Sequence, residues 1–542
     1  IKDRCARRKS SATWEAWPCL GDGSCAEVST RRFAKDVAMP ADLLIGVDAG
    51  TSVIKAVAFD LGGRQVGASS VPNRYLRGDD GSATQSLEAT WADCVTALRG
   101  LAEKVENLAA RTAALAVTAQ GDGTWLVGAG NVPTADAWLW LDARAAPTVQ
   151  GLAASPLNRA RFEGHGHGPQ YLPAGVANGP YGPSRRVLAR QGRSGAALQG
   201  LALSESDGCA RHRPRYDDTV IDALGLNHRR HLLPEIIDGT QITHGLTADA
   251  ARQTGLLAGT PVCLGYVDMA MTALGAGVHT GEANTACSIV GSTGVHLRSV
   301  TIDEVWLNPA QTGYVIPLPW PGYVTQVQTN MASTLNLDWL LNVASDLLSS
   351  FGCETDHARL VQQIDRWLND AQPGTLLFHP YISLAGERGP FVNADARASF
   401  TGLNYQHNFG DLVRGVIEGI GMAARDCYQA MGATLPGEIR LTGGAVRSQP
   451  LRQILAACIG APVRISQREE AGAAGAAMMA AVAIGAYPDM AQCVERWVRP
   501  LLDDAEAPSP ALMQRYQQLF PQYQQIRRDL PAAWQALNSF KE

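Results

Sequence analysis

The sequence predicts an α/β protein built from two similar halves, and three observations support this prediction. Residues 43–60, LLIGVDAGTSVIKAVAFD, are two apolar, β-branched runs joined by a turn of small residues, which is typical of a β-hairpin. Residues 282–297, EANTACSIVGSTGVHL, repeat this pattern in the second half of the chain. Candidate strands and helices alternate after each hairpin. Two such hairpins indicate a duplicated fold with a nucleotide between its halves.

The composition is that of a globular protein with room for two large domains. The chain has 542 residues, of which 46% are apolar and 18% are charged. A net charge of -5 gives no reason to expect nucleic acid or a membrane surface as partner. No apolar run reaches transmembrane length, and the 11 Cys residues lack paired metal spacing, which favours a reducing, cytoplasmic location.

The first 38 residues differ from the rest of the chain. They begin on Ile1, lack apolar periodicity and contain no apolar core of a signal peptide. Met39 and Pro40 directly precede the first clear strand. We therefore expect Met39 to be the natural start and residues 1–38 to be a non-native or disordered upstream extension.

The first hairpin is a candidate phosphate site. Gly50 leaves the backbone of the turn open to an anion, and the Thr51 and Ser52 hydroxyls add donors. Asp48, at the end of the first strand, is placed to hold hydrated Mg²⁺ against that anion. An ordinary β-hairpin with a DAG turn is the alternative interpretation.

The rest of the first half predicts further strands, a helix and a polar binding surface. We expect a third strand over 64–72, a helix over 86–110, and over 113–127 a strand, a Gly-containing break and a second strand. An aromatic-rich strand end follows over 136–145. Polar residues at strand ends are where α/β folds place ligands. The candidates for binding a polyhydroxyl compound are Asp122, Asp142 and Arg144, with Trp138 or Trp140 against its C–H face; a solvated turn and a packed Trp are the alternative.

Residues 164–214 have neither helix nor strand periodicity and are rich in Gly, Arg, Pro and His. A His-rich metal tract and a disordered linker are two interpretations. We favour a third, a frameshifted and disordered segment, because a reading frame one nucleotide later can encode a more protein-like sequence. The underlying DNA decides this question.

The second half supplies a candidate base and further ligand turns. Residues 259–278 predict a strand, a turn carrying Asp268 and a helix, so Asp268 is either a helix cap or a general base. Residues 407–431 predict a helix, and 438–463 predict a strand, a GG turn and a helix, where bare backbone can admit adenine or ribose. Residues 468–487 predict a packed helix of small residues, and 488–542 a peripheral helical tail.

Taken in order, these motifs resemble the FGGY family of carbohydrate kinases, which have the actin-like ATPase fold. The similarity covers about residues 42–162 and 216–487 and rests on DAGTS, QGDGTW, WLWLDAR, GYVDMAMTALGAG, GSTG, GERGPFVNADARASFTGL and LTGGAVRSQPLRQ. Gly415 stands where the family usually has Ala or Ser. The family's Lys-containing first-domain signature is not visible, since it would fall within 164–214.

The resemblance implies two actin-like (ribonuclease H-like) domains, 39–281 and 282–487, with the active site in the cleft between them. ATP and Mg²⁺ would be required, with Asp268 as general base and Asp48 at the metal. The implied phosphate and nucleoside contacts are Gly50, Thr51, Ser52, Gly291, Ser292, Thr293, Gly443, Gly444 and Ala445. The implied substrate side is Asp122, Trp140, Asp142, Arg144 and Asp268.

By resemblance to the family, QGDGTW and WLWLDARA imply the tetritol erythritol as acceptor, with a pentulose as the alternative. An inactive frameshifted product is a third interpretation. The GERGP and NADAR segments argue against an actin-like ATPase without a sugar substrate. A homodimer is left open.

Overall fold

Two six-stranded sheets organise the chain, and their strands follow corresponding orders. In each sheet a three-stranded antiparallel meander is extended by two parallel strands. The first sheet is β3 (Gln65–Pro72), β2 (Val53–Asp60), β1 (Leu43–Ala49), β6 (Thr112–Ala119), β9 (Pro261–Leu264) and β8 (His244–Gly245). The second is β12 (Tyr314–Pro317), β13 (Tyr323–Asn330), β11 (Gly294–Thr301), β10 (Thr285–Val290), β16 (Glu438–Thr442) and β17 (Val463–Ile465). This correspondence confirms the predicted duplication and both hairpins.

The computed structural model describes residues 41–540, with gaps. The gaps are Asp122, 156–157, 160–161, 163–215, Asp217, Leu224, 235–237, 241–243, 280–283 and Glu354. The predictions for 1–38 and 164–214 therefore lie outside the described residues.

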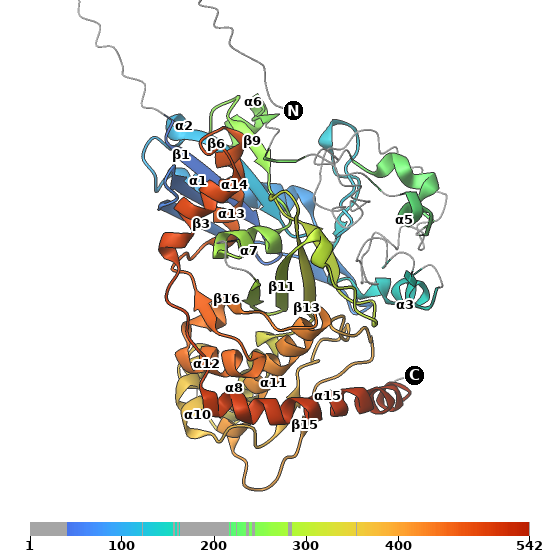
Figure 1. The fold of residues 1–542 in the computed structure, drawn as a ribbon. Helices are drawn as coiled ribbons and strands as arrows, with labels where there is room; N and C mark the ends of the chain where they lie inside the picture. The colour runs from blue at the N-terminus through green and yellow to red at the C-terminus, as the bar shows by residue number, and fades with distance from the viewer. Residues whose placement is uncertain are drawn as a thin grey trace, which may run out of the picture. The chain divides into compact units, whose positions relative to one another are not determined.

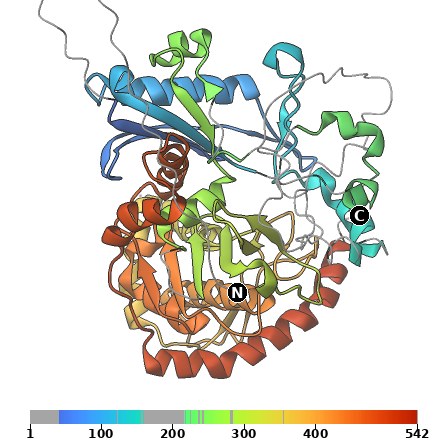
Figure 2. The same ribbon diagram turned by 45° about the horizontal axis from the view of Figure 1, so that its top comes forward.

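Two small sheets and most of the helices lie outside the space between the large sheets. The small sheets are β4 (Leu76–Arg77), β5 (Ala83–Gln85) and β7 (Ala137–Trp138), and β14 (Leu377–His379) with β15 (Ser399–Thr401). The helices are α1 (Leu87–Ala102), α2 (Leu108–Arg111), α3 (Ala146–Ala154), α5 (Asp218–Ala223), α6 (Ala248–Thr254), α8 (Thr334–Ser350), α9 (His357–Val361), α10 (Ile364–Asp370), α11 (Phe409–Ala430), α12 (Gln449–Ile459), α14 (Met490–Trp497) and α15 (Pro510–Asn538). Figure 2 shows α1 along the outer face of the first sheet and α15 at the opposite side.

Two helices fill the space between the sheets, α7 (Asp268–Ala276) and α13 (Ala471–Ala483), as Figure 1 shows. α13 packs on β1 and β6 of the first sheet, while α7 contacts α13 and strands β10 and β16 of the second. Their side chains join residues of both sheets in one buried core. The C-terminal half of the sequence thus returns, through α13, to the sheet that the N-terminal half builds.

Glycines allow α7 and α13 to approach closely. A Cβ at Gly475 would lie 2.1 Å from the Met271 carbonyl oxygen, and one at Gly275 would lie 2.1 Å from the Ala471 oxygen. At the sheet, a Cβ at Gly46 would lie 1.9 Å from the Ala473 oxygen. Side chains at these three positions would collide with backbone, so the contacts depend on glycine.

Two of the predicted elements differ from the structure. The helix predicted over 86–110 ends at Ala102, and the short α2 begins after Asn107, which adopts a left-handed backbone (φ 54°). The second strand predicted within 113–127 is wrong, since after β6 only isolated bridges form at Thr124 and Val127. A Cβ at Gly123 would lie 2.8 Å from the Trp138 oxygen, so this segment is a closely packed loop instead.

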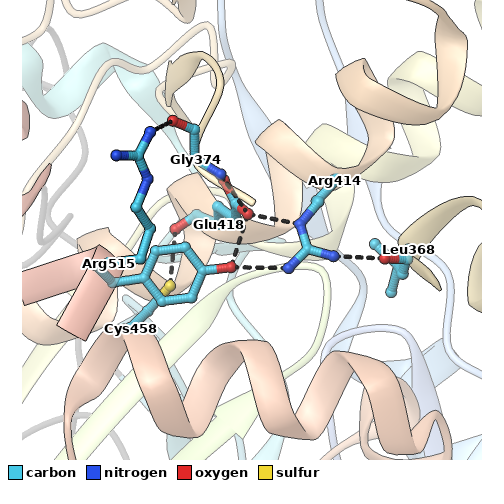
Figure 3. A network of polar contacts seen from close by, with 7 residues as sticks. Leu368, Gly374, Arg414, Glu418, Cys458 and Arg515 are labelled. Carbon is cyan, nitrogen blue, oxygen red and sulfur yellow. Dashed lines mark hydrogen bonds and ion pairs between the residues drawn. The ribbon is translucent and has the colours of Figure 1, made fainter. Parts of the chain in front are cut away.

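The C-terminal segment is helical, as predicted, and α15 contributes to the second core. Its Tyr516, Phe520 and Tyr523 are buried there. Figure 3 shows Arg414 and Glu418 of α11 at the centre of a polar network beside this core.

The centre of that network is an ion pair in which both side chains are buried. Arg414 Nε lies 2.8 Å from Glu418 Oε1, which also accepts the Tyr516 hydroxyl at 2.7 Å. The backbone N–H of Gly374 donates to the same carboxylate at 3.1 Å. Between Arg414 and Glu418 lies Gly415, which departs from the family pattern; a Cβ there would lie 2.2 Å from Leu376 Cδ1, so the Leu376 side chain would have to shift. Leu376 occupies the space that a larger residue would need.

Candidate active site

A ring of side-chain hydrogen bonds holds the turn between β1 and β2. Thr51 Oγ1 donates to Gln120 Oε1 at 2.8 Å, and Gln120 Nε2 donates to Gln85 Oε1 at 2.7 Å. Gln85 Nε2 then donates to Asn73 Oδ1 at 2.8 Å, and Asn73 Nδ2 closes the ring on the Gly50 carbonyl at 2.7 Å. The buried amides are thus satisfied, and the predicted phosphate turn is fixed from behind.

Sequence reasoning missed the three amide residues of this ring. They come from three separate segments, after β3, in β5 and after β6, and they meet only when these strands assemble with β1. In contrast, Ser52 at the end of the turn is exposed, which leaves its hydroxyl accessible to a ligand.

Asp48 faces the start of α13. A Cβ at Gly472 would lie 2.3 Å from Asp48 Oδ2 and 3.2 Å from Thr272 Oγ1 of α7, so these three residues converge. Oδ1 of Asp48 is buried and has no hydrogen-bond partner among the described residues. A buried carboxylate oxygen without a partner is a suitable ligand for a hard cation, which prefers oxygen donors.

Charges around Asp48 tune its protonation. Burial raises the pKa of Asp48 to about 6, opposed by the Lys55 ammonium and reinforced by the Glu470 carboxylate. Lys55 and Glu470 form an ion pair of 2.7 Å between β2 and the residue before α13. The carboxylate of Asp48 is therefore costly to ionise without a cation beside it.

Asp268 is the first residue of α7, and Val267 occupies the cap position. Its Oδ1 accepts the backbone N–H of Met269 at 2.7 Å, and the side chain is half-buried. Thr272, which lies near Asp48, is about one helical turn further along α7. The same helix therefore carries Asp268 toward the Asp48 side of the site.

The second hairpin turn and the GG turn lie against one another. Gly291 to Thr293 join β10 to β11, and the start of α8 is tied to them by Ser333 N–H on the Ser292 oxygen, at 2.8 Å. Gly443 has a φ of 109°. A Cβ on it would lie 2.3 Å from the oxygen of Val290, directly before Gly291. Gly444 has open space around it and begins a 3₁₀ turn (Gly444–Arg447) that includes the backbone of Ala445.

On the substrate side, the structure ties Trp140 to the first turn. Trp140 Nε1 donates to Thr51 Oγ1 at 3.1 Å. The Arg388 guanidinium lies over the Trp140 ring, 4.9 Å from its centroid. Arg388 belongs to the GERGP segment, which the sequence marked as a family motif without giving Arg388 a role.

Asp142 and Arg144 form a pair. The Asp142 side chain is fully buried and receives Arg144 Nη2 at 2.5 Å and the Ala83 N–H at 3.0 Å. The Arg144 guanidinium also lies 3.9 Å from the Trp138 ring centroid. In this geometry Asp142 orients Arg144, and the more exposed Arg144 is the better placed of the two to meet a ligand. Asp122 lies outside the described residues.

The described residues contain no cluster of metal-binding side chains and no membrane-spanning helix. No group of three or more His, Cys, Asp or Glu among them could hold a metal ion. A cation at Asp48 would therefore complete its coordination with water and phosphate oxygens, as Mg²⁺ commonly does. Within the same residues, no helix is both long and apolar enough to cross a bilayer.

Comparisons with known proteins identify related sequences and folds. Models of the FGGY family of carbohydrate kinases match residues 43–168 and 204–275 (N-terminal domain) and 286–484 (C-terminal domain). An erythritol kinase from Brucella abortus is 54% identical over 92% of this chain and 98% of its own. An L-xylulose/3-keto-L-gulonate kinase from Escherichia coli is 26% identical over 89% and 96%. A ligand-bound xylulose kinase from Lactobacillus acidophilus superposes with a TM-score of 0.77, at 21% identity, over 92% of this chain and 100% of its own.

These comparisons confirm the predicted fold class, two actin-like ATPase domains. The gap in the N-terminal match, residues 169–203, falls within the segment 164–214 that the sequence analysis singled out. The frameshift remains a prediction, since that segment lies outside the described residues.

Proposed function

The chain belongs to the FGGY family of carbohydrate kinases, and we propose that it transfers the terminal phosphoryl group of ATP to a hydroxyl of erythritol. The observation that carries the choice of erythritol is the similarity to the Brucella enzyme, which extends over almost the whole of both chains. Pentulose kinases are more distant relatives. Members of one fold family differ in substrate, so the acceptor must be decided by assay.

In the proposed reaction, Asp268 accepts the proton of the attacking hydroxyl. The acceptor oxygen then bonds to the γ-phosphorus while the bond to the β-phosphate oxygen breaks and ADP leaves. The turn of Gly50, Thr51 and Ser52 binds the transferring phosphoryl group, and its hydrogen-bonded ring keeps the donors in place.

The remaining site residues bind the nucleotide and the acceptor. Gly291, Ser292 and Thr293 bind the other phosphates, while Gly443, Gly444 and Ala445 admit the nucleoside against bare backbone. Trp140 and Arg144 face the polyol, and Asp142 holds Arg144 in position. Asp122 stays a predicted contact of the acceptor from the sequence alone. Water excluded by domain closure cannot compete as acceptor.

Asp48 would hold Mg²⁺. Its unpartnered buried oxygen and raised pKa support this assignment. The cation would neutralise charge on the phosphates as the leaving group departs.

The test measures ADP release by the purified full chain with erythritol, glycerol, D-xylulose, L-xylulose, D-ribulose or no acceptor. We expect kcat/KM to be at least tenfold higher for erythritol than for the others. A higher value for a pentulose would favour the alternative, and acceptor-independent ADP release would favour a simple ATPase. An absence of ADP release would indicate an inactive product.

Asp268→Asn tests the base directly. We expect it to abolish phosphoryl transfer and to leave the dissociation constant for ATP within threefold. The matched control is Asp249→Asn, since Asp249 is exposed on α6. Near-normal turnover by Asp268→Asn would remove Asp268 from the role of base.

A homodimer and a cytoplasmic location remain predictions. Helix α8 supports the dimer, because exposed large apolar side chains recur at every fourth position in Leu335, Trp339, Val343 and Leu347, and Phe351 follows. Such a ridge can interdigitate with an antiparallel copy of itself. Light scattering should give twice the chain mass, and Leu347→Lys should lower it to one chain. A monomeric parent protein would refute the dimer.

A further inference from the structure

We propose that Arg388 contacts the phosphoryl group in transfer and stabilises its charge, as a catalytic residue of the reaction proposed above. The proposal rests on that proposed function. Its starting point is a guanidinium that is buried next to the first phosphate turn and is not neutralised by an ion pair among the described residues.

The backbone at Arg388 is rigidly held. Glu387 Oε1 accepts the N–H of Arg388 at 2.8 Å and of Met331 at 2.9 Å. The Gly389 carbonyl accepts Asn330 Nδ2 at 2.7 Å. A Cβ on Gly389 would lie 2.6 Å from the Thr329 oxygen, so the loop lies tightly against the end of β13. The second sheet therefore fixes the point from which the Arg388 side chain extends.

From this point, Arg388 reaches a residue of the first half. Its guanidinium lies over Trp140, and the indole N–H of Trp140 donates to Thr51 in the first phosphate turn. An aromatic face attracts a cation and orients the plane of the guanidinium. Arg388 is thereby connected, through Trp140, to the turn that is proposed to bind the transferring group.

Among the described residues, no ion pair neutralises the Arg388 guanidinium, and the nearby Glu387 carboxyl offsets its charge only in part. The residue is 8% exposed, and its Nε is buried without a hydrogen-bond partner among the described residues. Its neighbour Glu387 uses Oε1 on backbone N–H groups, and no ion pair joins the two side chains among the described contacts. Burial raises the pKa of Glu387 to about 7, so this carboxyl is only partly ionised at neutral pH.

Only one reactant class supplies the missing anion. A buried, unpaired guanidinium is costly, and a polyol or ketose is uncharged and cannot offset that cost. The nucleotide phosphates and the phosphorylated product are anionic, and the planar fork of Arg suits phosphate oxygens. Arg388 is linked through Trp140 to Thr51 of the first phosphate turn. We therefore assign its contact to the transferring phosphoryl group and not to the other phosphates.

Arg388 adds no covalent step to the reaction. Its N–H groups donate to non-bridging oxygens while the bond to ADP breaks and the bond to the acceptor oxygen forms. The proton still passes to Asp268. Donors aimed at charge in the transition state act mainly on kcat.

The test compares Arg388→Gln and Arg388→Lys with Arg397→Gln in the full chain. Arg397 lies on the same loop, where its Nη1 donates to the Ala394 and Ala396 carbonyls, and it serves as the matched control. We expect Arg388→Gln to lower kcat by roughly 10²–10³-fold, with KM for ATP and acceptor within threefold. Arg388→Lys should recover at least tenfold over Gln, and Arg397→Gln should stay within threefold of the parent.

A second measurement is independent of turnover. ADP with aluminium fluoride mimics the transferring group, and its dissociation constant is compared with that of ADP alone. Arg388→Gln should weaken binding of ADP with aluminium fluoride at least tenfold and leave ADP binding unchanged. This difference in binding would support the role of Arg388 even if no acceptor in the panel is phosphorylated. The latter result would refute the proposed function and not the contact of Arg388.

Three results would overturn the role of Arg388. The first is a kcat of Arg388→Gln within threefold of the parent. The second is an equal loss of affinity for ADP alone and for ADP with aluminium fluoride. The third is a higher KM for the acceptor with kcat preserved, which would place Arg388 on the acceptor. If Arg388→Gln does not fold, Arg388→Lys decides. Arg388→Lys keeps the positive charge and loses the planar guanidinium. It must still weaken the binding of ADP with aluminium fluoride more than the binding of ADP alone.

Discussion

Replacement of Gly475 by Ala tests the crossing of α7 and α13. The new Cβ would lie 2.1 Å from the Met271 oxygen, where ordinary contacts begin at 3.4 Å, so the helices must separate by roughly 1.3 Å. The clash is with backbone, which cannot rotate away as a side chain can. Overpacking costs about 1–3 kcal/mol or more, against a gain of up to about 1 kcal/mol in helix propensity. We expect a net destabilisation of about 1–2 kcal/mol.

The same separation should also reduce catalysis. α7 begins at Asp268, and α13 begins beside Asp48, so both proposed active-site carboxylates depend on this crossing. A displacement of about 1 Å can lower the rate on the order of 10²-fold. The assays are urea unfolding followed by Trp fluorescence, and kcat for acceptor-dependent ADP release.

Gly151→Ala is the matched control. Gly151 also lies in a helix, α3, and a Cβ there meets no atom within 4 Å. This variant should be as stable as the parent or slightly more stable, and equally active. If Gly475→Ala keeps both parental stability and parental kcat, close approach of these helices is not required, and the reasoning fails.

Three further predictions concern the nucleotide, the metal and the C-terminal helix. Gly443→Ala should weaken ATP binding at least tenfold in an equilibrium titration, because of its φ of 109° and the Val290 oxygen at 2.3 Å; Gly460→Ala, with a φ of 85° and no close backbone atom, should not. The Mg²⁺ concentration for half-maximal activity should rise about tenfold per pH unit below about pH 6 and be flat above it, because protonation of Asp48 (pKa raised to about 6) competes with the cation; a flat profile down to pH 5 would contradict this. Tyr516→Phe should lower the free energy of unfolding by about 1–3 kcal/mol, because Glu418 loses a buried donor; Tyr405→Phe, at an exposed residue, should change it little, and equal effects would contradict the structure.

Local patterns were sufficient to predict the hairpins and the turns. Two apolar runs joined by a turn of small residues form few structures other than a β-hairpin. Asp48 and Asp268 were chosen as candidates because one lies at a strand end and the other at a helix start. The same reasoning failed over 113–127, where the chain after β6 forms isolated bridges at Thr124 and Val127 and Gly123 packs closely against Trp138.

Contacts between distant segments were not predictable in this way. The ring behind Thr51 joins residues up to 69 positions apart, and although Gln120 lies in the QGDGTW motif, no local signal marks Asn73 or Gln85. α13 is a helix of small residues that is buried on all sides, so its sequence has no polar face to show which sheet it covers. For Arg388, the motif was visible, but its position over Trp140 depends on both halves of the fold.

The network of Figure 3 has a consequence for synthesis of the chain. Glu418 and Tyr516 are separated by 98 residues, so at about 5–20 residues per second the ribosome delivers this tyrosine roughly 5–20 seconds after the carboxylate. During that interval the nascent second domain exposes the apolar surface that α15 later covers. Chains that stop before α15 would keep this surface exposed, so the second core is complete only when the last segment of the chain has been made.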